Sequence, residues 1–175
     1  MDLALVERAR RGDPVAFELI VEDRAQAVYR LSLAILGNEA DAGDATQETF
    51  VAAWKGLPKL RDDRRFDAWL QRLSINSARM VLRGRRRRHV RELAAKGIAS
   101  ERAPSVRPDL DDGIALMVAL AHLPADQRAL LALHHLEGHP IEAIAEILEV
   151  PPGTVKSRLF AARNALRLLL GGPVR

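Results

Sequence analysis

The chain of 175 residues contains no cysteine, and aromatic residues make up only 4% of it. The lack of cysteine excludes a disulfide framework, a zinc site with cysteine ligands and a thiol nucleophile. With so few aromatic residues, a core has to be built from leucine, alanine, isoleucine and valine. No apolar run reaches the ~18 residues that would span a membrane, and residues 1–5 lack the features of a signal peptide. We therefore expect a cytoplasmic protein.

What the chain does contain is typical of a folded globular protein, with 48% hydrophobic and 29% charged residues. Its net charge of +4 hides a strong asymmetry, because residues 83–91 carry six arginines and no acid. Removing these six charges leaves a net charge of −2 for the rest of the chain. A basic cluster of this kind is typical of nucleic-acid binding, but it also occurs at the solvated end of a helix. Charge alone does not decide between the two interpretations.

The spacing of apolar residues predicts helices throughout, and no stretch alternates as a half-buried strand would. We expect helices over residues 2–11, 14–36 and 41–54, and a fourth that begins after Asp63 and runs into the arginine cluster. In the third helix, the residues predicted to face the core are Ala45, Val51 and Trp54, opposite Asp41, Asp44, Gln47 and Glu48. In the fourth, the predicted inward-facing residues are Phe66, Trp69, Leu70, Leu73, Met80 and Val81.

Turn residues and short polar residues mark the ends of these helices. Asp13 is expected to cap the second helix and Gly37 to end it. The paired carboxylates at residues 62–63 and 111–112 precede apolar helical runs, so helix capping explains them better than acid–base chemistry does.

Apolar periodicity fades between residues 90 and 109, where serine and proline accumulate. The sequence therefore predicts an all-α fold of two small helical domains. The first covers residues 1–91, a flexible linker covers 92–109, and the second domain covers 110–175. Each domain is expected to bury a modest core of its own, so that a fragment ending near Arg91 would fold alone.

The strongest local pattern lies near the C-terminus, where two short amphipathic helices flank a proline- and glycine-rich turn at residues 151–153. The second helix has an apolar stripe formed by Val155, Leu159, Ala162 and Leu166. This arrangement predicts a helix-turn-helix. Hydrogen-bond donors and cations lie off the stripe, and a recognition helix reads base edges with such side chains: Thr154, Lys156, Ser157, Arg158 and Arg163. The pattern by itself also fits an αα-hairpin with a polar outer face.

Two segments resemble a known family. Residues 123–170, with Leu-Pro-Ala-Asp-Gln-Arg at 123–128 and Gly-Thr-Val-Lys-Ser-Arg at 153–158, resemble the domain of bacterial sigma factors that binds the promoter −35 element. Residues 41–88, with Asp-Ala-Thr-Gln-Glu-Thr-Phe at 44–50 and the arginine cluster, resemble the domain that binds core RNA polymerase and the −10 element. The two segments in this order, around a linker, are similar to the extracytoplasmic-function group.

The resemblance implies roles for matching residues. The helix that docks on core polymerase is matched by Asp41, Asp44, Gln47, Glu48, Phe50 and Trp54. The acidic and amide side chains on this helix would suit a basic partner, although side chains of this kind also occur on a helix face that is simply exposed to solvent. The surface that receives the −10 strand is matched by Arg72, Asn76, Arg79, Arg83, Arg85, Arg86, Arg87 and Arg88. The residues that recognise the −35 element in this family are matched by Thr154, Lys156, Ser157 and Arg158, and Arg163 is grouped with them.

Three positions depart from the family pattern. Glu149 lies in the helix-turn-helix turn, where glycine is usual because a left-handed residue is needed. Met80 replaces an acidic residue and Gln71 an aromatic one, which leaves the −10 base preference open. These differences do not change the expected fold.

A metal site or an enzyme active site is disfavoured. His134, His135 and His139 lie near Glu137, but adjacent histidines on a helix point ~100° apart and Gly138 interrupts the spacing. The two tryptophans, Trp54 and Trp69, are expected to anchor the core. We find no phosphate-binding glycine loop and no nucleophile–base arrangement, so no cofactor is expected.

The leading hypothesis is a sigma factor that directs transcription initiation and catalyses nothing itself. The resemblance implies core RNA polymerase and promoter DNA as partners, together with an anti-sigma factor. One rival is a decoy that sequesters an anti-sigma factor, but a decoy needs neither a recognition helix nor an arginine cluster. Another is a helix-turn-helix regulator without polymerase binding, which would need a dimer surface or effector pocket at residues 41–54.

Overall fold

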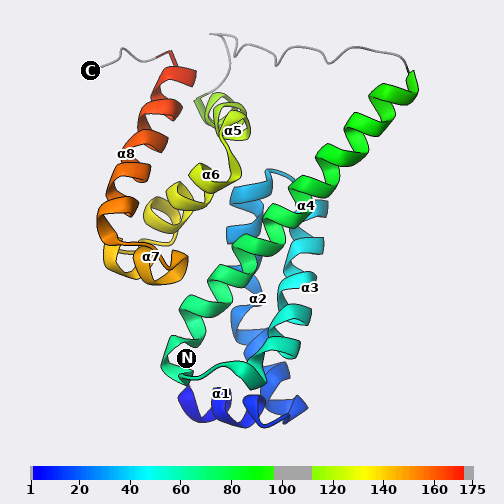
Figure 1. The fold of residues 1–175 in the computed structure, drawn as a ribbon, viewed down its shortest axis with the longest axis vertical. Helices are drawn as coiled ribbons and strands as arrows, with labels where there is room; N and C mark the ends of the chain where they lie inside the picture. The colour runs from blue at the N-terminus through cyan, green and yellow to red at the C-terminus, as the bar shows by residue number, and fades with distance from the viewer. Residues whose placement is uncertain (1, 97–111, 172–175) are drawn as a thin grey trace.

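The structure is a computed structural model that describes residues 2–96, here called the first half, and 112–171, the second half. Every regular element in these two ranges is helical (Figure 1), so the predicted all-α fold is confirmed. The first half contains α1 (Leu3–Arg10), α2 (Pro14–Leu36), α3 (Glu39–Gly56), η1 (Leu57–Lys59), η2 (Asp63–Arg65) and α4 (Phe66–Lys96). The second half contains α5 (Asp112–His122), α6 (Ala125–Leu131), η3 (Ala132–Leu136), α7 (Ile141–Leu148) and α8 (Pro152–Leu169).

The predicted caps at Asp13, Gly37 and Asp62 are confirmed, while α3 begins two residues earlier and ends two residues later than predicted. The Asp13 side chain accepts hydrogen bonds from the backbone amides of Val15 and Ala16 at the start of α2. Gly37 ends α2 with a left-handed φ of 75°. Asp62 accepts from the Arg64 amide and so caps the turn that leads into α4. Of the second predicted capping pair, residue 111 lies outside the described residues.

The core of the first half lies between α1, α2, α3 and the start of α4, with α1 crossing the end of the other three (Figure 1). Its largest side chains are Ile20, Phe50, Leu57 and Phe66. Trp69 packs against this cluster as predicted, with its ring centroid 5.8 Å from that of Phe66. Small residues on α3 let these helices approach closely, which suits a chain poor in aromatic residues.

Three predicted core residues are in fact exposed. Trp54 is 40% exposed and lies over Phe17 at the edge of the core, with ring centroids 4.9 Å apart. Val51 is 46% exposed, because the buried face of α3 follows Ala45, Thr49 and Ala53 at helical spacing and leaves residue 51 outside it. Met80 is 67% exposed for the same reason on α4.

A second apolar cluster joins the two halves. It combines side chains of α2 and α4 with side chains of α6, α7 and α8, among them Leu31, Ile35, Ile75, Leu133, Ile144 and Val155. The first half thus has a core of its own, as expected, but the halves also share buried apolar surface that the sequence did not predict. The predicted domain limits stay a prediction. Residues 92–96 of the predicted linker continue α4, and residues 97–109 lie outside the described residues.

Among the described residues, no helix combines the length and the apolar character that a membrane span requires.

Candidate functional site

The exposed face of α3 carries acidic and amide side chains. Asp44, Gln47 and Glu48 are exposed, whereas Asp41 is half-buried. The Asn38 amide donates to Asp41 at 2.6 Å, and the Arg85 guanidinium lies 3.4 Å from the same carboxylate. Asp41 is thus partly neutralised within the chain, which leaves Asp44 and Glu48 as the accessible charges.

Phe50 does not belong to this surface. Its side chain is only 8% exposed and packs in the core of the first half. Phe50, which the resemblance assigned to the polymerase-docking surface, is therefore not accessible to a partner there. Trp54, one turn further along α3, offers an aromatic surface instead. The acidic face of α3, defined here as Asp44, Gln47 and Glu48, is bordered by Trp54 and by exposed Val51.

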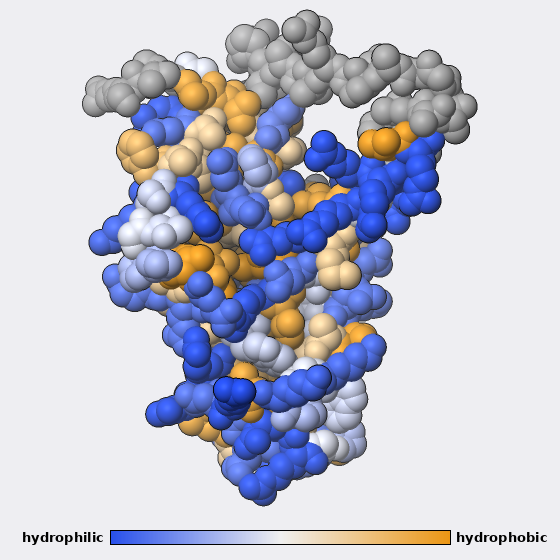
Figure 2. All heavy atoms as spheres, in the orientation of Figure 1, coloured by the Kyte–Doolittle hydropathy of each residue, from blue (hydrophilic) through white to orange (hydrophobic). Residues whose placement is uncertain are grey.

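The basic surface of α4 is divided into two parts. Arg83, Arg85, Arg86, Arg87 and Arg88 are exposed along the end of the helix. In the space-filling view, hydrophilic side chains cover most of this end of α4 (Figure 2). Arg72 and Arg79, nearer its start, instead form ion pairs with the second half. The predicted −10 surface is thus only partly accessible.

Five polar contacts cross from the first half to the second. The Arg79 Nε atom lies 2.7 Å from Asp126 Oδ1, and Arg72 pairs with Glu149. The others are Arg65–Glu146 at 2.9 Å, Arg30–Glu137 at 3.8 Å and Gln71–His139 at 2.8 Å. In every ion pair the cation belongs to the first half and the acid to the second. We call this packing the closed arrangement. Burial and the nearby Arg65 charge lower the pKa of Arg72 from its ordinary value.

The helix-turn-helix is formed by α7 and α8. Val155, Leu159 and Ala162 are buried as predicted, and Leu166 packs against the same cluster. Glu149 has a left-handed φ of 53°, so the sequence prediction that this turn needs such a residue is confirmed. A non-glycine residue in this conformation costs about 1–2 kcal/mol.

The predicted −35 residues lie on the outer side of α8. Lys156, Ser157, Arg158 and Arg163 are exposed and Thr154 is half-buried. The Arg163 Nε atom donates to Nε2 of His135 at 3.2 Å, which requires a neutral imidazole. Burial, together with the Arg163 charge, lowers the pKa of His135 and favours that neutral form.

The predicted −10 and −35 residues meet in the closed arrangement. Arg158 of α8 lines a small cavity of about 90 Å³ together with Arg72, Asn76 and Arg79 of α4. The Arg79 guanidinium also donates to the Asn76 side-chain oxygen at 3.1 Å. Sequence reasoning missed this convergence, because nothing local in either segment indicates which surface the other will cover.

The histidines of the second half serve as hydrogen-bond partners. The His134 ring bonds to the His139 backbone oxygen at 3.0 Å, and His139 bonds to Gln71. Within residues 2–96 and 112–171, no group of three or more acidic or histidine side chains could hold a metal ion.

Comparison with known proteins identifies the two halves. Residues 20–88 match the family described as Sigma-70 region 2, and residues 114–166 match Sigma-70, region 4. Two solved structures are similar to the whole fold. CnrH in complex with the cytosolic domain of CnrY has a TM-score of 0.68 and 28% identity, covering 97% of both chains. RpoE in complex with the anti-sigma factor NepR, from Bartonella quintana, has a TM-score of 0.63 and 26% identity, covering 89% of this chain and 96% of that one.

Curated relatives match at higher identity. The RNA polymerase sigma-H factor of Pseudomonas aeruginosa is 34% identical, covering 94% of this chain and 91% of the relative. The ECF RNA polymerase sigma-E factors of Haemophilus influenzae and Escherichia coli K12 are each 32% identical over 94% of this chain, covering 93% and 92% of the relatives. With both sigma-70 regions present in order and near full-length similarity, the chain belongs to the ECF group of the sigma-70 family of RNA polymerase sigma factors.

Proposed function

We propose that this sigma factor, which acts in transcription initiation through promoter recognition, binds core RNA polymerase through the acidic face of α3. The separated −10 strand would lie along α4, where arginines hold phosphates and Asn76 can bond to a base edge. The −35 duplex would receive α8 in its major groove. The observation that carries the proposal is the exposed row of cations and donors on α8, opposite its buried apolar stripe. The protein would work in the cytoplasm as a regulator and not as an enzyme.

Promoter binding would require the closed arrangement to open. Arg72 and Arg79 are engaged by acids of the second half, and Arg158 lines the same small cavity. A DNA strand on α4 would need arginine side chains that acids of the second half now engage, whereas most of the −35 residues of α8 are already exposed. Core polymerase, by holding the two halves apart, would release Arg72 and Arg79 for the −10 strand. An anti-sigma factor is the further partner, as in the solved RpoE complex with NepR.

Charge reversal on α3 tests the polymerase surface. The double variant Asp44→Lys, Glu48→Lys is expected to weaken binding to core polymerase by roughly tenfold or more, because like charges would then face a basic partner. Affinity can be measured by fluorescence anisotropy with labelled full-length protein. The matched control reverses Glu18 and Glu22, which are exposed four residues apart on α2. Equal binding by wild type and the α3 variant would place the docking surface elsewhere.

Substitutions on α8 test the −35 surface. Arg158→Ala is expected to cost ~1–3 kcal/mol on the preferred duplex and to flatten the preference among sequences, because arginine bonds to guanine through two parallel hydrogen bonds. Lys156→Ala is expected to weaken all duplexes equally and to lower the salt slope by roughly one, as a lost phosphate contact does. Binding of holoenzyme to duplexes selected by the wild type, at two salt concentrations, measures both effects. Uniform weakening by Arg158→Ala would mean that Arg158 contacts a phosphate.

A further inference from the structure

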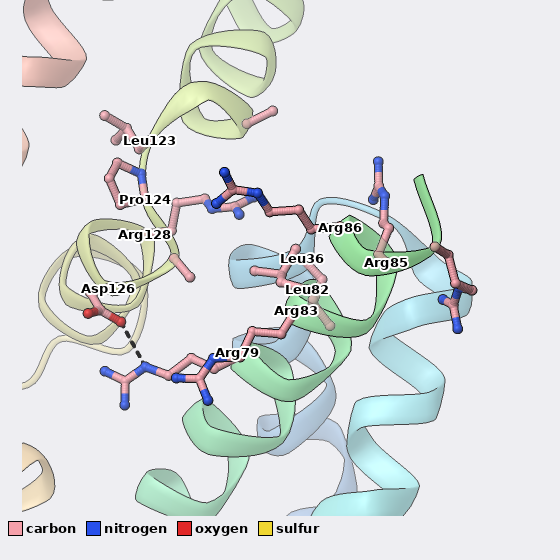
Figure 3. Close-up of a pocket in the computed structure, with 13 residues that line it drawn as sticks. Leu36, Arg79, Leu82, Arg83, Arg85, Arg86, Leu123, Pro124, Asp126 and Arg128 are labelled. Carbon is pink, nitrogen blue, oxygen red and sulfur yellow. Dashed lines mark hydrogen bonds and ion pairs between the residues drawn. The ribbon is translucent and has the colours of Figure 1, made fainter. Parts of the chain in front are cut away.

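A wide basic cleft lies between the end of α4 and the α5–α6 turn. Its volume is about 1090 Å³, and both halves of the chain contribute to its walls (Figure 3). Six arginines line it, five from α4 and one from α6: Arg79, Arg83, Arg85, Arg86, Arg88 and Arg128. We call this the arginine cleft. Among the described residues that line it, Asp126 is the only acid, and it is already paired with Arg79 at 2.7 Å.

Arg128 is the feature that sets this cleft apart from an ordinary basic surface. It is only 8% exposed, and its Nε atom is buried without a hydrogen-bond partner. No carboxylate of the described residues forms an ion pair with it. Burial lowers the pKa of Arg128 from its ordinary value, and the Arg85 charge lowers it further. A buried cation without a counter-charge costs several kcal/mol, which a bound anion would offset.

The neighbouring arginines add to this excess of positive charge. The Arg86 and Arg128 side chains extend toward one another across the cleft (Figure 3). Arg83, Arg86 and Arg88 likewise form no ion pair with a described carboxylate, whereas Arg85 lies 3.4 Å from Asp41. Leucine side chains form part of the walls, and such apolar surface lowers the local dielectric and strengthens any charge interaction: Leu36, Leu82 and Leu123. Several guanidinium groups without an ion-pair partner among the described residues thus surround the cleft, and an anion with several charges could pair with them together.

We propose that the arginine cleft binds a polyphosphate chain, carried by a nucleotide or free as inorganic polyphosphate, and that the bound chain holds the two halves closed. Guanidinium groups bind phosphates through two parallel hydrogen bonds, which a chain of phosphates can offer repeatedly. The cleft is large enough for a nucleotide-sized ligand, since small-molecule pockets are typically ~300–1,000 Å³. The proposed promoter surfaces lie on α4 and α8, whereas Arg128 belongs to α6 and is only 8% exposed. Arg128, the residue that defines this site, therefore belongs to neither of the proposed promoter surfaces.

The test uses the full-length chain without polymerase, so it does not depend on promoter binding. Isothermal titration at constant ionic strength compares inorganic tripolyphosphate, ATP and monophosphate. We expect tripolyphosphate to bind and to raise the melting temperature, and monophosphate to bind far more weakly. Arg128→Met is expected to bind tripolyphosphate roughly tenfold more weakly or worse. Without ligand, its melting temperature should equal or exceed that of wild type, because an uncompensated buried charge is removed. Arg61→Gln, an exposed arginine outside the cleft, is the charge-matched control.

The comparison of ATP with tripolyphosphate identifies the ligand, and the Arg128→Met variant tests the site. Tighter binding of ATP than of tripolyphosphate would identify a nucleotide as the ligand, and equal binding would show that the phosphate chain alone is recognised. Tripolyphosphate affinity unchanged in Arg128→Met would overturn the proposal. Equal losses of single-stranded −10 DNA and tripolyphosphate binding in that variant would assign Arg128 to DNA and overturn the proposal as well. Arg86→Gln changes an exposed side chain and must show a similar loss, so the proposal stays testable if Arg128→Met fails to fold.

Discussion

Leu133→Ala is expected to lower the free energy of unfolding by about 2–5 kcal/mol, and to do so in both halves of the chain. Leu133 is fully buried in the cluster that α2 and α4 share with α6, α7 and α8. Truncating it leaves a cavity between the halves and removes apolar contacts from each. Because the cluster is continuous, the loss should reach the first half, which carries no substitution.

The distribution of tryptophan makes this coupling measurable. The chain contains two tryptophans, Trp54 and Trp69, and both belong to the first half. Their fluorescence therefore follows unfolding of the first half, whereas circular dichroism follows all helices. One coincident transition, shifted by Leu133→Ala in both signals, is the expected result. Leu168 is an exposed leucine on α8, so Leu168→Ala should leave the fluorescence and circular dichroism transitions unchanged. A shift in circular dichroism alone would show that the halves fold independently, as the sequence first indicated.

The helices and their ends follow from local rules, which is why the sequence predicts them well. Asp13 caps α2 because its side chain accepts hydrogen bonds from nearby backbone amides, and Gly37 ends the helix because glycine adopts a left-handed φ without strain. The stripe on α8 is recognisable because Val155, Leu159 and Ala162 repeat at helical spacing over a short element. In such cases one or two turns of chain contain all the information that the prediction needs.

Packing between distant segments is not encoded in any one window, and here the predictions fail. Val51 and Met80 are apolar and were expected to face the core, but both are exposed. Which face of a long helix is buried depends on neighbouring helices whose positions the sequence does not give. Phe50 is buried because α3 lies against the core of the first half on that side. Arg128 gives no local signal at all, because its burial depends on α4 and the α5–α6 turn meeting over it.

Removing three acids of the second half is expected to open the closed arrangement. The variant Asp126→Asn, Glu146→Gln, Glu149→Gly eliminates the partners of Arg79, Arg65 and Arg72. Each of these partly exposed pairs contributes about 1 kcal/mol, so the closed arrangement would lose about 3 kcal/mol, or ~100-fold in its equilibrium. The turn between α7 and α8 tolerates the change, because glycine adopts the left-handed φ of 53° at position 149 without strain.

If the closed arrangement opens, the radius of gyration in X-ray scattering should increase, and the free protein should bind single-stranded −10 DNA more tightly. Loss of three negative charges attracts DNA by itself, so the control must change charge equally. Glu18→Gln, Glu22→Gln, Glu142→Gln removes three exposed acids that face none of these arginines. If both variants bind DNA equally well and remain compact, the ion pairs do not hold the halves together. The shared apolar cluster would then be sufficient to keep the two halves together and the start of α4 covered.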